Sequence, residues 1–104
     1  MSKLPNHFTS FLETYPDVGE AYSSLGKAVA EAGPLDAKTR ELIKLGISVA
    51  AGLEGGTHSH ARKALEAGAT PEELKHAVLQ SLTTIGFPQM MRGLAWVEGV
   101  VEKT

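Results

Sequence analysis

Breaks made of glycine and proline divide this chain into segments of the length of ordinary helices. They lie at Tyr15-Pro16, Gly33-Pro34, Gly68 and Gly86-Phe87-Pro88. Between them, apolar residues recur at spacings of three and four rather than two, which is the period of a helix. Glycine directly after a helix and proline shortly beyond it are common stop positions. The sequence therefore predicts an all-α fold of five or six helices without a sheet.

Three of the expected helices begin at residues that cap helices well. Asp17 with Glu20, and Thr70 with Glu73, have the spacing at which an N-cap and an acid bond each other's backbone amides. Asp36 is the third expected N-cap. The expected helices cover residues 5–14, 17–32, 37–53, 57–67, 71–85 and 88–102.

Two of these helices carry more apolar surface than one core contact needs. In the helix 37–53 the apolar residues form one stripe and a set that widens it: Leu42, Leu45, Val49 and Leu53, with Ile43, Ile47 and Ala50. A helix this apolar is expected at the centre of the core. In the last helix, Trp96 lies on a different side from the stripe that Met90 begins. We expect one side to face the core and the other a partner chain of the same kind, in a homo-oligomer.

Composition excludes several classes of function. The 104 residues suffice for a single domain, 1–104. The formal net charge is −2 and no basic run occurs, so we expect no nucleic-acid partner. No apolar run approaches the ~18 residues that span a membrane, and the N-terminus lacks the apolar core of a signal peptide, so we expect no membrane partner and a cytoplasmic location. The chain has no cysteine, which excludes thiol chemistry.

The segment 52–60, GLEGGTHSH, is the part of the chain most suggestive of chemistry. Gly55-Gly56 is expected to end the central helix and free the backbone for a sharp reversal. These glycines match no recognised phosphate-binding spacing. His58 and His60 lie roughly 200° apart around their helix at about 100° per residue, so they do not both face one small site.

The block from Arg40 to about Trp96 resembles the carboxymuconolactone decarboxylase family, which also holds the alkylhydroperoxidase D-like proteins. The resemblance rests on three stretches in the family's order: RELIKLGISVAAGLEGG, THSHARKALEAGATPEELKHAV and TTIGFPQMM. It implies an all-α bundle of the alkylhydroperoxidase D-like type. It also implies assembly as a homo-oligomer, a trimer or a hexamer.

The resemblance also implies which residues are functional. The redox branch of the family pairs two cysteines with a glutamate and a histidine that relay protons. Glu41 and His60 stand at the glutamate and histidine positions, whereas Leu53 and Gly56 stand where the cysteines would be. A family-level peroxidase or peroxiredoxin activity is therefore not expected. The decarboxylase branch also lacks the cysteine pair and keeps the histidine and the acid, and this chain resembles it more closely there.

Decarboxylation of a small lactone needs a group that delivers a proton to carbon and a group that holds a carboxylate. His60 is the candidate general acid–base, because histidine gives and takes protons near neutrality, and Glu41 would orient it. Arg62 is the candidate carboxylate anchor, with Arg40 as its alternative, because a guanidinium makes two parallel bonds to a carboxylate. His58 is a candidate for substrate binding. This scheme requires no cofactor.

Other interpretations of the same residues remain open. His60 equally suits the role of a structural hydrogen-bond partner. Glu41 equally suits the role of a surface acid near Lys44. His58 suits a position at a helix terminus or in a subunit contact. A metal site is not predicted, although Glu41 and His60 could share one with another chain. The expected function is a cofactor-free acid–base enzyme on a small lactone or unsaturated carboxylate, and the alternative is a catalytically silent ligand-binding or structural homo-oligomer.

Overall fold

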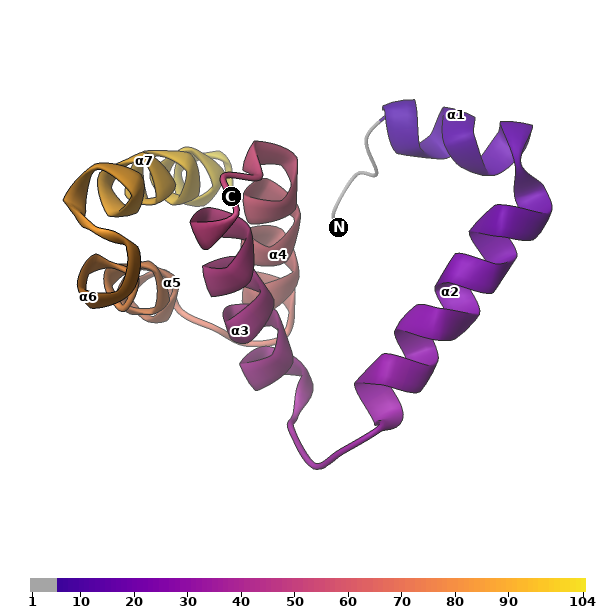
Figure 1. The fold of residues 1–104 in the computed structure, drawn as a ribbon, viewed down its shortest axis with the longest axis horizontal. Coiled ribbons are helices and arrows are strands. Elements are labelled where there is room, and N and C mark those ends of the chain that lie inside the picture. The colour runs from indigo at the N-terminus through magenta and orange to yellow at the C-terminus, as the bar shows by residue number, and fades with distance from the viewer. Residues whose placement is uncertain (1–5) are drawn as a thin grey trace. The chain divides into compact units, whose positions relative to one another are not determined.

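The computed structural model of the chain describes residues 6–104, and these residues form helices with no strand (Figure 1). The helical segments are α1 (Asn6–Thr14), α2 (Pro16–Glu31), α3 (Ala37–Ala50), α4 (Glu54–Glu66), α5 (Pro71–Leu79), α6 (Leu82–Ile85) and α7 (Phe87–Lys103). The all-α prediction is confirmed. With the single turn α6 set aside, the described residues form six helices, the upper end of the expected range.

The chain divides into two compact units. The first extends to Leu35, and the second covers Asp36–Thr104. The expected single domain over 1–104 stays a prediction. None of the helices in residues 6–104 combines the length and apolar character needed to cross a membrane.

In the first unit, α1 packs against α2 through one close approach. Gly19 is the buried residue of α2, and a Cβ added there would lie 2.5 Å from Cδ2 of Leu12. The apolar stripe of α2 is not buried within this unit, because its large side chains are more than half exposed: Val18, Tyr22, Leu25 and Val29. About 30 residues with so little buried surface do not form an independent core.

The core of the second unit lies between α3, α4, α5 and α7. Each of these helices contributes buried apolar residues: Leu45 and Val49, Ala61 and Ala64, Leu74 and Val78, and Met90, Val97 and Val100. The expectation that Ile43 and Ile47 widen the buried stripe of α3 is wrong for this unit, since they are 46% and 60% exposed. The other helices pack on the side of α3 that carries Leu45 and Val49.

Two of the three expected N-caps are confirmed. The side chain of Asp36 accepts a hydrogen bond of 2.8 Å from the Thr39 amide. Thr70 and Glu73 form the complete reciprocal capping box at α5. The cap at Asp17 is wrong: α2 begins at Pro16 and its N-cap is Tyr15, without a side-chain bond. Proline has its φ fixed near the helical value and takes the first helical position, which places Asp17 inside the first turn.

Two predicted boundaries around the GLEGG stretch are also wrong. The helix expected over 37–53 ends at Ala50, and Gly52, with φ of +72°, makes the reversal that was assigned to Gly55-Gly56. The next helix begins at Glu54, not at residue 57. A left-handed residue just after a helix ends it at once, because its backbone cannot continue the right-handed turn.

The helix expected over 71–85 is divided in two. It stops at Leu79, and α6 resumes at Leu82. Ser81 is buried, and its hydroxyl donates a 2.7 Å hydrogen bond to the carbonyl of Val78. A serine side chain that bonds a nearby carbonyl competes with the regular helical hydrogen bond. Leu82, four residues after the buried Val78, is 37% exposed.

The capping box of α5 is tied to α3 by an ion pair. Lys38 Nζ lies 3.0 Å from Glu73 Oε2. The Thr70 backbone amide, and then Lys38, hold the pKa of the Glu73 carboxyl below its usual value. A lowered carboxyl pKa means that the stabilisation is present at pH values above the ordinary glutamate pKa and is lost as the pH falls through the folded-state pKa.

Thr70→Ala is expected to lower the free energy of unfolding by about 1 kcal/mol, because the Glu73 amide loses its cap. Urea denaturation followed by circular dichroism measures the change. Thr83→Ala is the matched control, since Thr83 is exposed and no hydrogen bond of its side chain occurs within residues 6–104. Equal losses in the two variants would contradict the role of the cap.

Candidate active site

The histidine and the glutamate singled out in the sequence meet between α3 and α4. His60 Nδ1 lies 2.7 Å from Glu41 Oε1. The two helices lie side by side in the second unit (Figure 1). The pair stands at the edge of the packed interface, because Leu45 and Ala61 beside it are fully buried. The side chains of His60 and Glu41 are 22% and 17% exposed, so the pair is largely desolvated yet open to solvent.

This contact fixes which imidazole nitrogen carries the proton. An ionised carboxylate only accepts hydrogen bonds, so Nδ1–H of His60 donates to Glu41. The neutral ring then presents its lone pair at Nε2. No other hydrogen bond of the His60 side chain occurs within residues 6–104. A carboxylate behind the ring also stabilises the imidazolium that forms when Nε2 takes a proton. The pair therefore has the geometry of an oriented acid–base group.

His58, the other candidate histidine, approaches a carboxylate other than that of Glu41. Nε2 of His58 lies 3.9 Å from Glu54 Oε2, one turn earlier on α4. His58 and His60 thus approach different carboxylates, as the angle between them predicts. Arg62 is half-buried and leaves α4 roughly 200° away from His60. The substrate-binding roles of His58 and Arg62 stay predictions, as does that of Arg40.

The two glycines before His60 lie in the first turn of α4. A Cβ on Gly55 would meet no atom within 4 Å. A Cβ on Gly56 would lie 2.9 Å from Oγ of Ser48 and 3.4 Å from Cβ of Leu53. The space beside Gly56 is therefore filled by neighbouring side chains, Ser48 of α3 among them. Gly56 instead permits α3 and α4 to approach closely, two turns along α3 from the Glu41–His60 pair.

Two polar side chains that were not singled out in the sequence lie against glycines of this stretch: Ser48 against Gly56, and Arg92 against Gly52, which precedes α4. Ser48 of α3 is 5% exposed. Arg92 of α7 has a terminal guanidinium nitrogen 2.9 Å from the place where a Gly52 Cβ would lie, and its guanidinium carbon is 5.0 Å from the centre of the Trp96 ring. Ser48 lies within the first of the stretches that carry the family resemblance, where no role was assigned to it, and Arg92 directly follows the third. Gly52 is the sequence feature that could have indicated the contact with Arg92, because close approach of another side chain is one reason for glycine to occupy a position.

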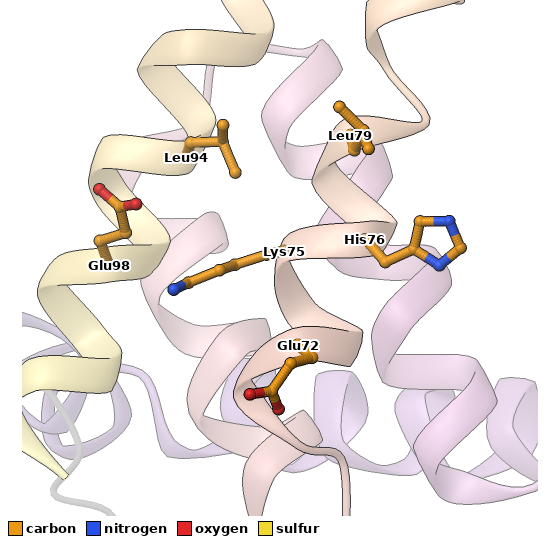
Figure 2. Close-up of a pocket in the computed structure, with 6 residues that line it drawn as sticks. All are labelled: Glu72, Lys75, His76, Leu79, Leu94 and Glu98. Atoms are coloured by element: carbon orange, nitrogen blue, oxygen red, sulfur yellow. The ribbon is translucent and has the colours of Figure 1, made fainter.

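A shallow hollow elsewhere in the second unit does not include the predicted residues. Figure 2 shows it between α5 and α7, with Leu79 and Leu94 at one end and the charged side chains at the other. Its volume is about 380 Å³, and its lining is Glu72, Lys75, His76, Leu79, Leu94 and Glu98. The Glu41–His60 pair has defined acid–base geometry and the hollow does not, so the pair is the candidate site. Among residues 6–104, no group of three or more histidines and acids is gathered closely enough to hold a metal ion.

Fold and site together define a class: an all-helical protein in which a histidine and a carboxylate from neighbouring helices form a pair, without any thiol in the chain. The sequence profile of the carboxymuconolactone decarboxylase family matches residues 16–99. The chain belongs to that family.

The chain is also similar to two known proteins. It is similar to a carboxymuconolactone decarboxylase family protein from Legionella pneumophila, whose apo form was crystallised, with 29% identity and a TM-score of 0.81 over 92% of this chain and 86% of that one. It is 41% identical over 63 residues to an uncharacterized protein of Haemophilus influenzae. That match covers 61% of this chain and 56% of the relative, so the chain spans little more than half of the relative's length.

Proposed function

We propose that the chain is a cofactor-free acid–base enzyme that acts on a small lactone or unsaturated carboxylate. The 2.7 Å contact between His60 Nδ1 and Glu41 Oε1 is the observation that supports this proposal most directly. It orients the imidazole ring and leaves Nε2 available both to accept and to donate a proton. Membership of the carboxymuconolactone decarboxylase family supports the substrate class.

The proposed reaction is the loss of carbon dioxide from a γ-carboxy lactone. The bond between the ring carbon and the carboxyl carbon breaks, and its electron pair enters the conjugated lactone. Protonated His60 then delivers the proton from Nε2 to carbon, and Glu41 stabilises the imidazolium until that transfer. The next substrate or water returns the proton to Nε2. No oxidant, reductant or thiol takes part, in keeping with the absence of cysteine.

The alternative is a catalytically silent ligand-binding or structural homo-oligomer. A histidine that served only packing would be expected in a filled, solvent-free position. His60 is instead 22% exposed, at hydrogen-bond distance from an acid. This observation favours the enzyme. A peroxidase or peroxiredoxin activity of the family's thiol type is not proposed, because the chain has no sulfur nucleophile.

The test of the proposed function is a screen of γ-carboxy lactones and unsaturated dicarboxylates, read by thermal shift and by carbon dioxide release. We expect at least one compound to stabilise the wild type and to be turned over without added cofactor. Parallel wells with divalent metals and a chelator test a shared metal site. If no compound binds or reacts while the protein remains folded, the silent alternative is correct.

We also propose a homo-oligomer, a trimer or a hexamer, as the working form. The exposed stripe of α2, with Tyr22 64% and Leu25 60% exposed, supports this proposal because apolar surface on this scale favours association. Light scattering after size exclusion is expected to give a multiple of the 11.0 kDa chain mass, and Leu25→Glu a smaller particle. Lys27→Glu, on the opposite side of α2, is the control. A monodisperse monomer at micromolar concentration would contradict the proposal.

A further inference from the structure

Two measured contacts determine which parts of α3 and α4 face each other. His60 Nδ1 lies 2.7 Å from Glu41 Oε1. Two helical turns further along α3, Ser48 Oγ lies 2.9 Å from the place where a Cβ of Gly56 would be, and Gly56 stands one turn before His60 on α4. The two helices therefore run in opposite directions. The side of α3 that leads from Glu41 to Ser48 faces the side of α4 that leads from His60 back to Gly56.

Lys44 stands on this side of α3, between the two contacts. It follows Glu41 by three residues and precedes Ser48 by four. These are the spacings at which residues are neighbours on one side of a helix, with about 5–6 Å between their Cβ atoms. The flexible four-carbon stem of a lysine covers such a distance. The Lys44 ammonium and the Glu41–His60 pair therefore share one edge of the interface between α3 and α4.

The charge of Lys44 is half-buried and is not taken up by a carboxylate. Within residues 6–104, no hydrogen bond or ion pair includes the Lys44 side chain. Glu41, the carboxylate one turn before it on α3, is bonded by His60 instead. A half-buried cation attracts an anion more strongly than an exposed one does, because less water screens the charge. Lys44 is thus available to an anion that approaches His60.

We propose that Lys44 binds the oxyanion that forms when the substrate loses carbon dioxide. The electron pair of the broken bond enters the conjugated lactone and places negative charge on the lactone carbonyl oxygen. The Lys44 ammonium donates a hydrogen bond to this oxygen as the charge develops, and keeps its own protons. Protonated His60 then delivers its proton from Nε2 to carbon, and the negative charge disappears. A donor held in advance at the place where charge develops is usually among the largest contributions to catalysis.

The other cations of these two helices are less well placed for this role. Arg62 leaves α4 roughly 200° away from His60, and Arg40 leaves α3 roughly 100° away from Glu41. Lys63 follows His60 by three residues and is the nearest rival, but it is exposed, so water screens its charge. The role of Lys44 in decarboxylation rests on the proposed function, whereas binding of a stable oxyanion beside His60 requires no reaction.

The binding experiment uses 4-nitrophenolate, whose negative oxygen is conjugated with a ring as in the proposed oxyanion. The full chain is titrated with it while the histidine ring signals are followed by nuclear magnetic resonance. We expect the His60 signals to shift with saturation. 4-Nitroanisole, which has the same ring without the charge, should shift them at least tenfold less at equal concentration. Equal shifts with 4-nitroanisole would overturn the proposal, as would saturable shifts at His76 of the α5–α7 hollow without any at His60.

Substitutions separate Lys44 from general positive charge. Lys44→Gln is expected to weaken 4-nitrophenolate binding about tenfold or more, and Lys44→Arg, which keeps the charge, should retain most of the binding. Lys63→Gln and Lys75→Gln remove the same charge from exposed positions on α4 and α5, and each should change binding less than about threefold. Circular dichroism establishes that the variants are folded. Unchanged binding in Lys44→Gln, or an equal loss in either control or in Lys44→Arg, would overturn the site.

Kinetics distinguish this proposal from the proposed function. With the responsive lactone, Lys44→Gln should lower kcat about 10- to 100-fold, less than a fully enclosed oxyanion donor contributes, because the pair is open to solvent. KM should change less than about threefold, since the oxyanion does not exist in the bound substrate. If 4-nitrophenolate binding depends on Lys44 while no substrate reacts, the oxyanion site stands without the enzyme. If turnover is found and Lys44→Gln leaves kcat unchanged, the enzyme stands and the role of Lys44 is wrong.

Discussion

Replacing His60 with glutamine is expected to lower turnover of the responsive lactone or carboxylate by about 10²- to 10⁴-fold, the usual contribution of a general acid–base group. Glutamine fills a similar volume and still offers a polar group to Glu41 Oε1, but it cannot carry the proton. The loss should fall on kcat rather than on KM, because His60 is proposed to act in the chemical step. Steady-state kinetics on the wild type and the variant measure it.

Two further variants serve as comparisons for His60→Gln. Glu41→Gln keeps an acceptor for Nδ1 but removes the negative charge, so we expect a loss of the same kind and of smaller size. His7→Gln changes an exposed histidine of α1 and should leave the rate unchanged. Circular dichroism establishes that each variant is folded. A His60→Gln protein that retains half of the wild-type kcat would exclude His60 as the acid–base group.

The second large effect is expected in the core. Gly93→Ala should lower the free energy of unfolding by about 1–3 kcal/mol, the usual range for overpacking. A Cβ at Gly93 would lie 2.6 Å and 2.9 Å from the two methyl carbons of Val49, and 3.2 Å from Cγ1 of Val78. Both valines are fully buried and stiff at χ1, so they cannot turn aside. Either α7 moves away from α3 and α5, or the contacts stay strained.

Gly99 in the same helix provides a control substitution, for which we expect the free energy of unfolding to change in the opposite direction. A Cβ on Gly99 meets no atom within 4 Å, so Gly99→Ala should raise the free energy of unfolding by up to about 1 kcal/mol through helix propensity. Val49→Ala combined with Gly93→Ala should lose less than the sum of the single variants, since the deleted methyl groups are those in conflict. Urea denaturation of the wild type, the three single variants and the double variant measures these changes. Equal effects at Gly93 and Gly99 would contradict the close packing of α7.

Local rules determined most of the secondary structure. The reciprocal bonds at Thr70 and Glu73, and the cap at Asp36, depend on atoms within three residues, and the structure forms them as expected. The same rules failed where two local preferences competed. Pro16 took the first helical position ahead of the Asp17 cap, and the buried Ser81 hydroxyl interrupted a helix whose apolar spacing continued. Spacing alone does not rank such competing preferences.

Only part of the candidate site could be predicted from the sequence. The family resemblance nominated Glu41 and His60, which stand 19 residues apart on separate helices. Their 2.7 Å contact depends on the register between α3 and α4, which the close approach at Gly56 sets. The contact between Arg92 and Gly52 could not be predicted from the sequence, because no sequence motif links these two distant positions.

By itself the sequence determined the all-α class and the absence of thiol chemistry, and it nominated Glu41 and His60 as a pair, because these follow from periodicity, composition and the family resemblance. The tertiary structure decided which nitrogen of His60 faces Glu41, and which side chains meet the first turn of α4. Those contacts join residues from different helices. Their distances are set by how closely the helices pack, and packing depends on every side chain in the interface at once.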